Sequence, residues 1–469
     1  MGKYHSTVSR RDFLKILGLG GVGLGVAAVS APVFHDLDEV IASPQADFKR
    51  PWYVKEVDKP TVEIDWKMMK RFDYNQIMWM AGLRKALGPD EFERVFRVQQ
   101  ENRIKWIKEN RPGYTLRDDA FLNCSQWTPM SFLGPQTSQT PEQLGVPRWE
   151  GTPEENARMI RAFLRFHGAH HVGFVELESN TTEKLIYSYN AGPNIGLPGV
   201  PFVQGPQLVF TDADQPTETN QMQTIPKKAR WVVVYTIRMA DELMKRAPTV
   251  VDARASHAMY NLRSLMEGQL QNFLRALGYM ALSSSFAFHH LGIAVGMGVM
   301  AGLGETCRTM HLMTPEYGIR QRVFSSVITD LPLAPGKPID FGVMKFCRVC
   351  KKCADFCPVQ AIPHDTDPSW EVRGFYQNPG VRIWRRNDPV CNAYMRQAGF
   401  FEGCAICLAV CPLSKGNRKA FYHDIMRATV STTPVLDRFF RNMDDFFGYG
   451  IKGDPETFWE MDLPPFGWE

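Results

Sequence analysis

The chain has 469 residues, 44% of them apolar, which is enough to bury one large core or a few smaller ones. Its formal net charge is only +4 and no long block of like charges occurs, so the composition excludes the basic patch of a nucleic-acid-binding protein. We therefore expect no nucleic-acid partner. Eight of the ten cysteines lie between residues 347 and 411, which indicates a local metal site rather than a disulfide framework.

The N-terminus has the pattern of an export signal. Arg10 and Arg11 form a twin-arginine signature, and an apolar, glycine-rich run follows over residues 16–34. A membrane anchor is the alternative, but Pro32 and many small residues interrupt the run, so a stable span is not expected. Residues 1–42 are predicted to be a twin-arginine signal peptide. We expect the mature protein to be exported and peripheral on the outer face of the cytoplasmic membrane.

Two larger regions follow the leader. Residues 43–150 are rich in Trp, Met, Pro and charge, with a helix expected over 90–109, and we interpret them as an N-terminal wrapping region. Residues 151–340 open with a helix-start signal, in which Thr152 is the N-cap and Pro153 takes the first helical position. Apolar periodicity then predicts strands at 172–177, 231–237 and 323–328 and a helix at 252–277. This alternation indicates a mixed α/β layer fold.

A glycine-rich run after the long helix ends at Gly302 and Gly304. Glycine lets the backbone approach a large flat ligand closely, so both are candidate cofactor-binding residues. Loop flexibility or tight helix packing is the alternative, and the run alone does not decide between them.

The strongest motif is a bacterial-ferredoxin run with the spacing Cys347-x2-Cys350-x2-Cys353-x3-Cys357-Pro358. A second run contains Cys391, Cys404, Cys407 and Cys411, followed by Pro412. In such runs three thiolates hold one [4Fe–4S] cluster, and the fourth reaches the neighbouring cluster. Cluster one is therefore assigned to Cys347, Cys350, Cys353 and Cys411. Cluster two is assigned to Cys357, Cys391, Cys404 and Cys407.

Zinc is the competing ligand for paired Cys-x2-Cys motifs. Eight cysteines with two Cys-Pro endings fit two four-iron clusters better. Cys124 and Cys307 stand outside the pattern, and we assign neither a role, because an isolated cysteine is most often a small buried apolar residue.

Further motifs occur in a specific order. They are Thr152-Pro153-Glu154-Glu155-Asn156, Leu277-Gly278-Tyr279, Ala301-Gly302-Leu303-Gly304-Glu305, Thr314-Pro315-Glu316-Tyr317-Gly318, Thr329-Asp330-Leu331-Pro332-Leu333 and Phe447-Gly448-Tyr449-Gly450. With the leader and both cysteine runs, they resemble the catalytic subunit of the reductive dehalogenases, the corrinoid and iron–sulfur enzymes of organohalide respiration. The resemblance implies a nitroreductase-like, corrinoid-binding core over 151–340, a ferredoxin-type two-cluster domain over 341–420 and a C-terminal extension over 421–469.

The resemblance also implies cofactors and partners. The core would enclose a cobalamin-type corrinoid in its base-off form, with no histidine as lower cobalt ligand. His289 and His290 lack the Asp-x-His-x-x-Gly pattern of such a ligand, so we interpret them as core or pocket-lining residues. The implied partners are a small organohalide substrate, a small membrane-anchor protein and an upstream electron donor of the respiratory chain.

Two residues match the family's catalytic positions. Reductive dehalogenation needs a proton donor near the substrate carbon and a cation that steadies both the donor's anion and the leaving halide. Tyr260 matches the donor, and Arg322 matches its basic partner. Ordinary core packing is the alternative for a lone tyrosine on an amphipathic helix.

The third polar member of the site is not assigned. Some relatives carry an asparagine shortly after Leu-Gly-Tyr, where this chain has serines at 283–285. Arg308 and Arg320 are further candidates. Trp127, Phe286 and Phe288 are candidate apolar walls.

Two alternative functions remain at this point. An exported iron–sulfur electron-transfer subunit would need the cysteine runs, but not the roughly 300 residues before them. A queuosine-precursor epoxide reductase also resembles a corrinoid core joined to two clusters. It acts on transfer RNA in the cytoplasm, and the export signal and low charge argue against it.

Overall fold

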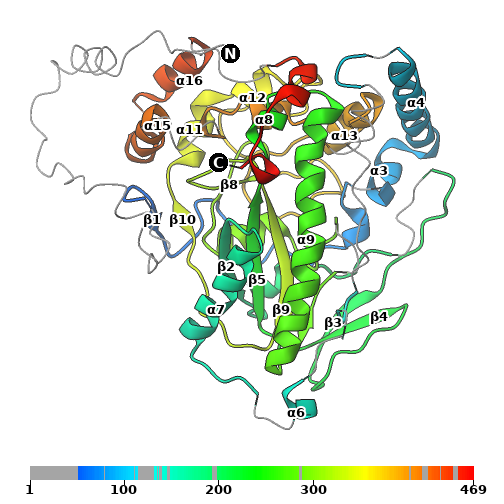
Figure 1. Cartoon of the computed structure of the whole chain (residues 1–469), viewed down its shortest axis with the longest axis vertical. Helices are drawn as coiled ribbons and strands as arrows, with labels where there is room; N and C mark the ends of the chain where they lie inside the picture. The colour runs from blue at the N-terminus through cyan, green and yellow to red at the C-terminus, as the bar shows by residue number, and fades with distance from the viewer. Residues whose placement is uncertain are drawn as a thin grey trace, which may run out of the picture. The chain divides into compact units, whose positions relative to one another are not determined.

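A four-stranded antiparallel sheet, in the order β2-β5-β9-β6, forms the centre of the computed structural model (Figure 1). Its strands are β2 (His171–Glu176), β5 (Trp231–Arg238), β6 (Ala281–Leu282) and β9 (Gln321–Thr329). The three longer strands confirm the predicted ones. They are rich in β-branched and aromatic residues, which favour the pleated and buried surface of a sheet.

The structure describes residues 51–469 except 79, 110, 115–130, 135, 137–139, 145–147, 193–197, 285–287, 401–402, 415–420, 434, 447–452 and 469. The predicted leader over 1–42, Cys124, Trp127 and Phe286 lie outside the described residues, as does the motif that begins at Phe447.

Helices cover both faces of the sheet. Successive side chains of β5 point to opposite faces, so they pack into two apolar layers. Tyr235 and Ile237 belong to the layer with α7 (Pro153–Phe166) and α9 (Val250–Leu277). Val232 and Val234 belong to the layer with α10 (Ala294–Met300) on the opposite face. Figure 1 shows α9 running lengthwise beside β5 and β9. The mixed α/β core expected from the sequence is confirmed.

Both predicted helices of the core have the expected local signals. Thr152 caps α7, and its side chain and that of Glu155 form a reciprocal capping box. Thr249 caps α9 by accepting a hydrogen bond from the backbone N–H of Asp252. The helix ends at Gly278, whose φ of 92° belongs to the left-handed region that glycine adopts without strain.

The N-terminal region reaches both the core and the cysteine-rich segment. Its elements are β1 (Lys55–Glu56), η1 (Tyr74–Gln76), α3 (Met80–Leu87), α4 (Pro89–Lys108) and α6 (Pro141–Leu144). Strand β1 pairs with β10 (Ile339–Asp340), and α4 packs against α13 (Asp388–Gln397). The Asn102 side chain on α4 donates a hydrogen bond of 2.7 Å to the carbonyl oxygen of Gln397.

The remaining elements are short connections and the cysteine-rich segment. The connections are η2 (Thr182–Leu185), β3 (Gln207–Thr211), β4 (Met222–Pro226), α8 (Asp241–Met244), β7 (Glu305–Thr306) and β8 (Leu312–Met313). The C-terminal part contains α11 (Val343–Cys350), α12 (Lys352–Asp355), α14 (Ile406–Ala409), η3 (Pro412–Ser414), α15 (Phe421–Thr432), α16 (Asp437–Phe446), η4 (Pro455–Glu460) and η5 (Pro465–Gly467).

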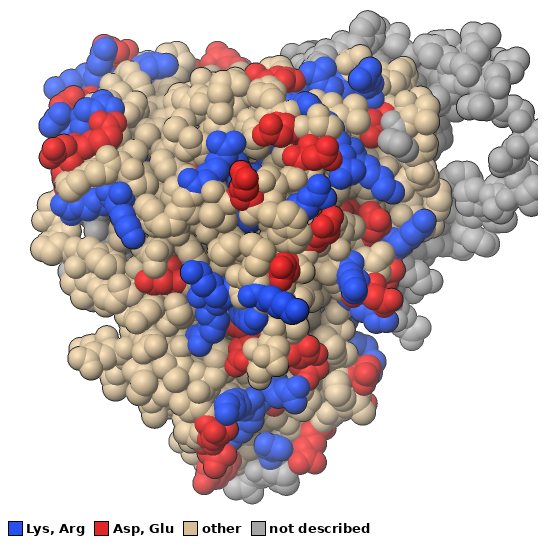
Figure 2. Space-filling view, turned by 180° about the vertical axis from the view of Figure 1, so that it is seen from behind, with Lys and Arg blue, Asp and Glu red and all other residues tan. Residues whose placement is uncertain are grey.

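Residues 52–469 form one compact unit, and the expected boundaries at 150, 340 and 420 within it stay predictions. Within the described part of the chain, no helix combines the length and apolar character needed to cross a bilayer. Figure 2 shows basic and acidic side chains interspersed over one face of the molecule.

Candidate active site and cysteine centres

The structure brings the two cysteine runs together crosswise. Burial raises the pKa of the Cys350 thiol to about 12, and the nearby Cys411 thiol contributes to this rise. Burial also raises the pKa of Cys391, and Cys357 is among its charged neighbours. Cys411 thus lies with the first run, and Cys357 lies with the second. The assignment of ligands to clusters one and two stays a prediction.

The backbone bends in the same way in both runs. Lys351 follows Cys350 with a φ of 52°, and Ala405 follows Cys404 with a φ of 34°. A left-handed conformation is costly for residues other than glycine, and it occurs mostly where a functional site requires it. Each bend lies inside a Cys-x2-Cys loop. Among the described residues, no three His, Cys, Asp or Glu side chains are arranged to hold a single metal ion.

Helix α9 presents a column of polar residues to the centre of the core. Asp252, Ser256 and Tyr260 are four residues apart, so they lie on one face of the helix. Arg322 on β9 donates a hydrogen bond of 2.8 Å from Nε to the Ser256 hydroxyl, one turn before Tyr260. Arg322 therefore reaches from β9 to the face of α9 that carries Tyr260.

Tyr260 lies in an aromatic setting. Its ring centroid is 4.5 Å from that of Phe288 and 5.6 Å from that of Phe324 on β9. Phe288 was a predicted wall residue, and the structure places it directly against Tyr260. The ring of His257 lies edge-on to Phe288 at 5.8 Å. Burial lowers the pKa of His257 to about 3, and the charges of Arg254, Arg322 and Arg396 add to this effect.

A fully buried ion pair lies one turn beyond Tyr260. Arg263 and Glu267 are both inaccessible to solvent and are paired along α9. The Ser283 hydroxyl donates to the Glu267 carboxylate, and Arg263 donates to the Ser284 hydroxyl at 3.2 Å. Tyr260 is among the electrostatic neighbours of Arg263. Serines at the position of the family's asparagine therefore connect to the helix that carries Tyr260.

The other polar candidates are placed elsewhere. Arg308 donates hydrogen bonds to the carbonyl oxygen of Cys347, in the first cysteine run. Arg320 forms an ion pair of 3.2 Å with Asp241. The buried His289 and the half-buried His290 lie against the rings of Tyr74 and Phe324, respectively. Burial lowers the pKa of His289 to about 3, so it is neutral in the core.

The carboxyl group of Asp252 is the clearest indication that the site binds an additional polar ligand. Both of its carboxyl oxygens are buried and have no hydrogen-bond partner among the described residues. Burial raises the pKa of Asp252 well above its ordinary value, although Arg322 opposes the rise. Buried polar groups are almost always hydrogen-bonded, so a ligand with donor groups fits this position. The peripheral amides of a corrinoid are donors of this kind.

Gly302 and Gly304 have a local explanation. Gly302 has a φ of 70° in the turn after α10. A Cβ atom on Gly304 would lie 2.1 Å from the carbonyl oxygen of Met313 in the β7–β8 hairpin. Close backbone packing therefore accounts for Gly304 without a ligand, and the role of both glycines in cofactor binding stays a prediction.

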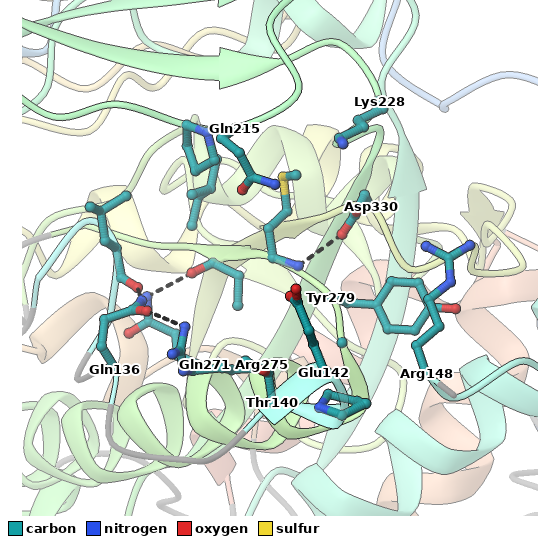
Figure 3. Close-up of a pocket in the computed structure, with 17 residues that line it drawn as sticks. Gln136, Thr140, Glu142, Arg148, Gln215, Lys228, Gln271, Arg275, Tyr279 and Asp330 are labelled. Atoms are coloured by element: carbon teal, nitrogen blue, oxygen red, sulfur yellow. Dashed lines mark hydrogen bonds between the residues drawn. The ribbon is translucent and has the colours of Figure 1, made fainter. Parts of the chain in front are cut away.

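A separate pocket of about 780 Å³ lies at the C-terminal end of α9 (Figure 3). Charged side chains of both signs line it, including Arg148, Lys228 and Asp330. Tyr260 and Arg322 are not part of its wall. The pocket is thus distinct from the polar column of α9.

Sequence reasoning missed Asp252, Ser256, His257 and the Arg263–Glu267 pair. The four-residue spacing before Tyr260 would have found Asp252 and Ser256. The ion pair also has helical spacing, but that spacing is common on exposed helices, and only the packing around it shows that it is buried.

Comparison with known proteins defines the class and then the family. Residues 346–414 match a 4Fe-4S double cluster binding domain, so the chain is an iron–sulfur protein. Residues 49–333, which are more than half of the chain, match the family model of the reductive dehalogenase subunit. The chain belongs to the reductive dehalogenase family, and it is an oxidoreductase rather than a lone electron carrier.

The relatives agree with this assignment. The chain is 29% identical over 529 residues to the chloroethene reductive dehalogenase of Dehalococcoides mccartyi (strain VS), with 100% of this chain and 99% of the relative covered. It is 33% identical over 322 residues to the tetrachloroethene reductive dehalogenase of Sulfurospirillum multivorans, covering 67% and 61%. The solved catabolic reductive dehalogenase NpRdhA shares the fold, with a TM-score of 0.58, 21% identity and 85% of this chain covered. This chain spans about half of that structure, 49% of its length.

Proposed function

We propose that the chain removes a halogen from a small organohalide at a bound corrinoid, with Tyr260 as the proton donor. The observation that carries the proposal is the polar column of α9. There Arg322 is hydrogen-bonded to Ser256, one turn before Tyr260, and the Asp252 carboxyl has no described hydrogen-bond partner. A corrinoid supplies a low-valent cobalt that delivers electrons to the carbon–halogen bond. The two clusters supply the electron path to it.

The side chains then have separate tasks. Removal of halogen consumes two electrons and one proton and releases one halide ion. Tyr260 gives its phenolic proton to the substrate carbon, and the positive charge of Arg322 stabilises the phenolate that remains. Phe288 and Phe324 exclude water and offer an apolar surface to a halocarbon. Asp252 holds the cofactor by accepting hydrogen bonds from its amides.

Chlorinated ethenes are the first substrates to test, because curated relatives over the full length of the chain are named for chloroethene and trichloroethene. The experiment is anaerobic purification, extraction of corrinoid with detection by its absorption spectrum, and assay of chloride release with a reduced dye as electron donor. A protein with its full iron content that contains no corrinoid would refute the proposal. The position of the absorption bands also tests the base-off form.

We further propose that the protein is exported by the twin-arginine pathway and held at the outer face of the cytoplasmic membrane by a small anchor protein. Its electrons would come from a respiratory donor. Arg10 and Arg11 before an apolar run support export. Replacing both by Lys should leave uncut precursor in the cytoplasm, as measured by fractionation and immunoblotting. Normal processing of this double variant would contradict the proposal.

A further inference from the structure

Arg308 is a buried cation whose described hydrogen bonds reach no anionic side chain. Its side chain is 1% exposed. All of its described hydrogen bonds go to neutral backbone carbonyls: Nε and Nη2 donate to Cys347 at 3.1 and 2.6 Å, and Nη1 donates to Pro363 and Asp365 at 2.7 Å each. Its guanidinium also lies 4.3 Å from the ring centroid of Trp384. Within the described chain, no carboxylate forms an ion pair with it.

A buried charge normally needs a counter-charge. The favourable electrostatic neighbours of Arg308 are led by the thiols of Cys347, Cys353 and Cys350, three of the four ligands of cluster one. Burial lowers the pKa of Arg308, but a guanidinium remains protonated at any pH relevant to the protein. A [4Fe–4S] cluster with four thiolates is anionic, so it supplies a counter-charge on the buried side of Arg308, whereas Asp365, the remaining anionic neighbour, is exposed.

The environment of cluster two is different. Arg386 lies close to the thiols of cluster two, because Cys391 and Cys407 are among the electrostatic neighbours of its guanidinium. Its Nε is 2.6 Å from the Asp388 carboxylate, which neutralises it. Asp252 also lies close to Cys404, on the side of cluster two. On the side of cluster one, by contrast, the buried Lys352 lies near Cys350 and adds a second positive charge.

We propose that Arg308 sets the reduction potential of cluster one and makes it the easier of the two clusters to reduce. Reduction adds one electron and no proton, so it increases the negative charge beside Arg308. A fixed cation therefore stabilises the reduced form more than the oxidised form, because net charge around a cluster tunes its potential. Cluster one then holds an incoming electron on the side away from Asp252 and Tyr260. This inference rests on the assignment of two clusters.

The test is a redox titration of the purified holoprotein with dithionite, followed by EPR. Arg308→Gln should lower the reduced fraction of cluster one at a fixed potential at least tenfold, a midpoint shift of about 59 mV for a one-electron couple. Arg308→Lys keeps the charge and should remain close to wild type. Arg441→Gln is the matched control: Arg441 also donates to a cluster-one carbonyl, that of Cys350 at 2.7 Å, but it is 30% exposed and paired with Asp355. It should shift the potential much less.

The outcomes separate the inference from the cluster assignment. Wild-type protein without about eight irons per chain would refute the assignment itself. With iron content equal to wild type, an unchanged cluster-one potential in Arg308→Gln, or an equal shift in Arg441→Gln, would overturn the role of Arg308. If Arg308→Gln loses iron, Asp388→Asn decides, because it leaves Arg386 without its carboxylate. The potential of cluster two should then rise, and no rise in an iron-replete variant would overturn the inference.

Discussion

The ring of Tyr260 packs against Phe288 and Phe324, and Tyr260→Phe keeps that ring while it removes the hydroxyl. Tyr260→Phe should retain both clusters and corrinoid but lose about 10²–10⁴-fold in turnover, the usual contribution of general acid catalysis. The measurement is chloride release at equal cofactor content. Tyr279→Phe is the matched control, because its hydroxyl bonds to the carbonyl of Trp149 at the far end of α9. Equal activity of the two variants would remove Tyr260 from the mechanism.

The Arg263–Glu267 pair should matter for stability. Glu267→Ala leaves Arg263 charged and buried, which typically costs about 3–5 kcal/mol. Arg97 and Glu101 on α4 have the same spacing but are 65% exposed, so Glu101→Ala should cost less than about 0.5 kcal/mol. Melting temperatures of the holoproteins would compare them. Similar melting temperatures of the two variants would contradict the stabilising role of the Arg263–Glu267 pair.

Glu305 makes stability depend on pH. Burial raises its pKa to about 7, despite hydrogen bonds from Thr61, Phe341 and Val343. An acid whose folded pKa is raised binds its proton more tightly in the folded state. The folded state therefore loses about 2–4 kcal/mol as the pH rises from about 4.5 to 7, with no further loss above. Glu305→Gln should remove this part of the pH dependence, measured as melting temperature from pH 5 to 8. Parallel curves for the two proteins would contradict it.

For single residues, roles that a short sequence motif indicates could be predicted. Roles that depend on packing between distant segments could not. The cysteine spacing led to the assignment of eight ligands, which stays a prediction, and the structure places Cys411 near the first run. No local pattern showed that Asp252 is buried without a partner, or that Arg308 lies at cluster one rather than near Tyr260. Both facts depend on contacts between segments far apart in sequence.

Among the elements, α7 offers the most direct test of a sequence signal. Thr152→Ala removes one half of the capping box and should cost about 1 kcal/mol, whereas Thr152→Ser keeps a hydroxyl and should be nearly neutral. The melting temperature reports both changes. A loss in Thr152→Ser as large as in Thr152→Ala would show that the methyl group matters and the cap does not.

The elements predicted best were those with long periodic patterns. The helix expected over 252–277 appears as α9, which begins only two residues earlier, at Val250. Strand β6 was missed, because two residues paired at the end of β9 carry no periodicity of their own. The β1–β10 pair was missed for a similar reason: its partners are nearly 300 residues apart, and pairing at that distance leaves no local signal.

For the whole molecule, the crossing of the cysteine runs predicts which cluster each mutation affects. Cys411→Ser should alter the EPR signal of cluster one, and Cys357→Ser that of cluster two, although each residue lies closer in sequence to the ligands of the other cluster. The two single variants serve as controls for each other. The reverse result, in which Cys411→Ser alters the signal of cluster two and Cys357→Ser that of cluster one, would show that each run binds its own cluster.

The contact between α4 and α13 has a consequence for synthesis of the chain. About 280 residues separate the end of α4 from the start of α13, which carries Cys391. At translation rates of 5–20 residues per second, α4 waits roughly 15–60 s on the ribosome before its partner exists. During that time its apolar face is open to chaperones. The helix and cluster two can be completed only after nearly the entire polypeptide has emerged, so cluster insertion belongs to the last stage of biogenesis.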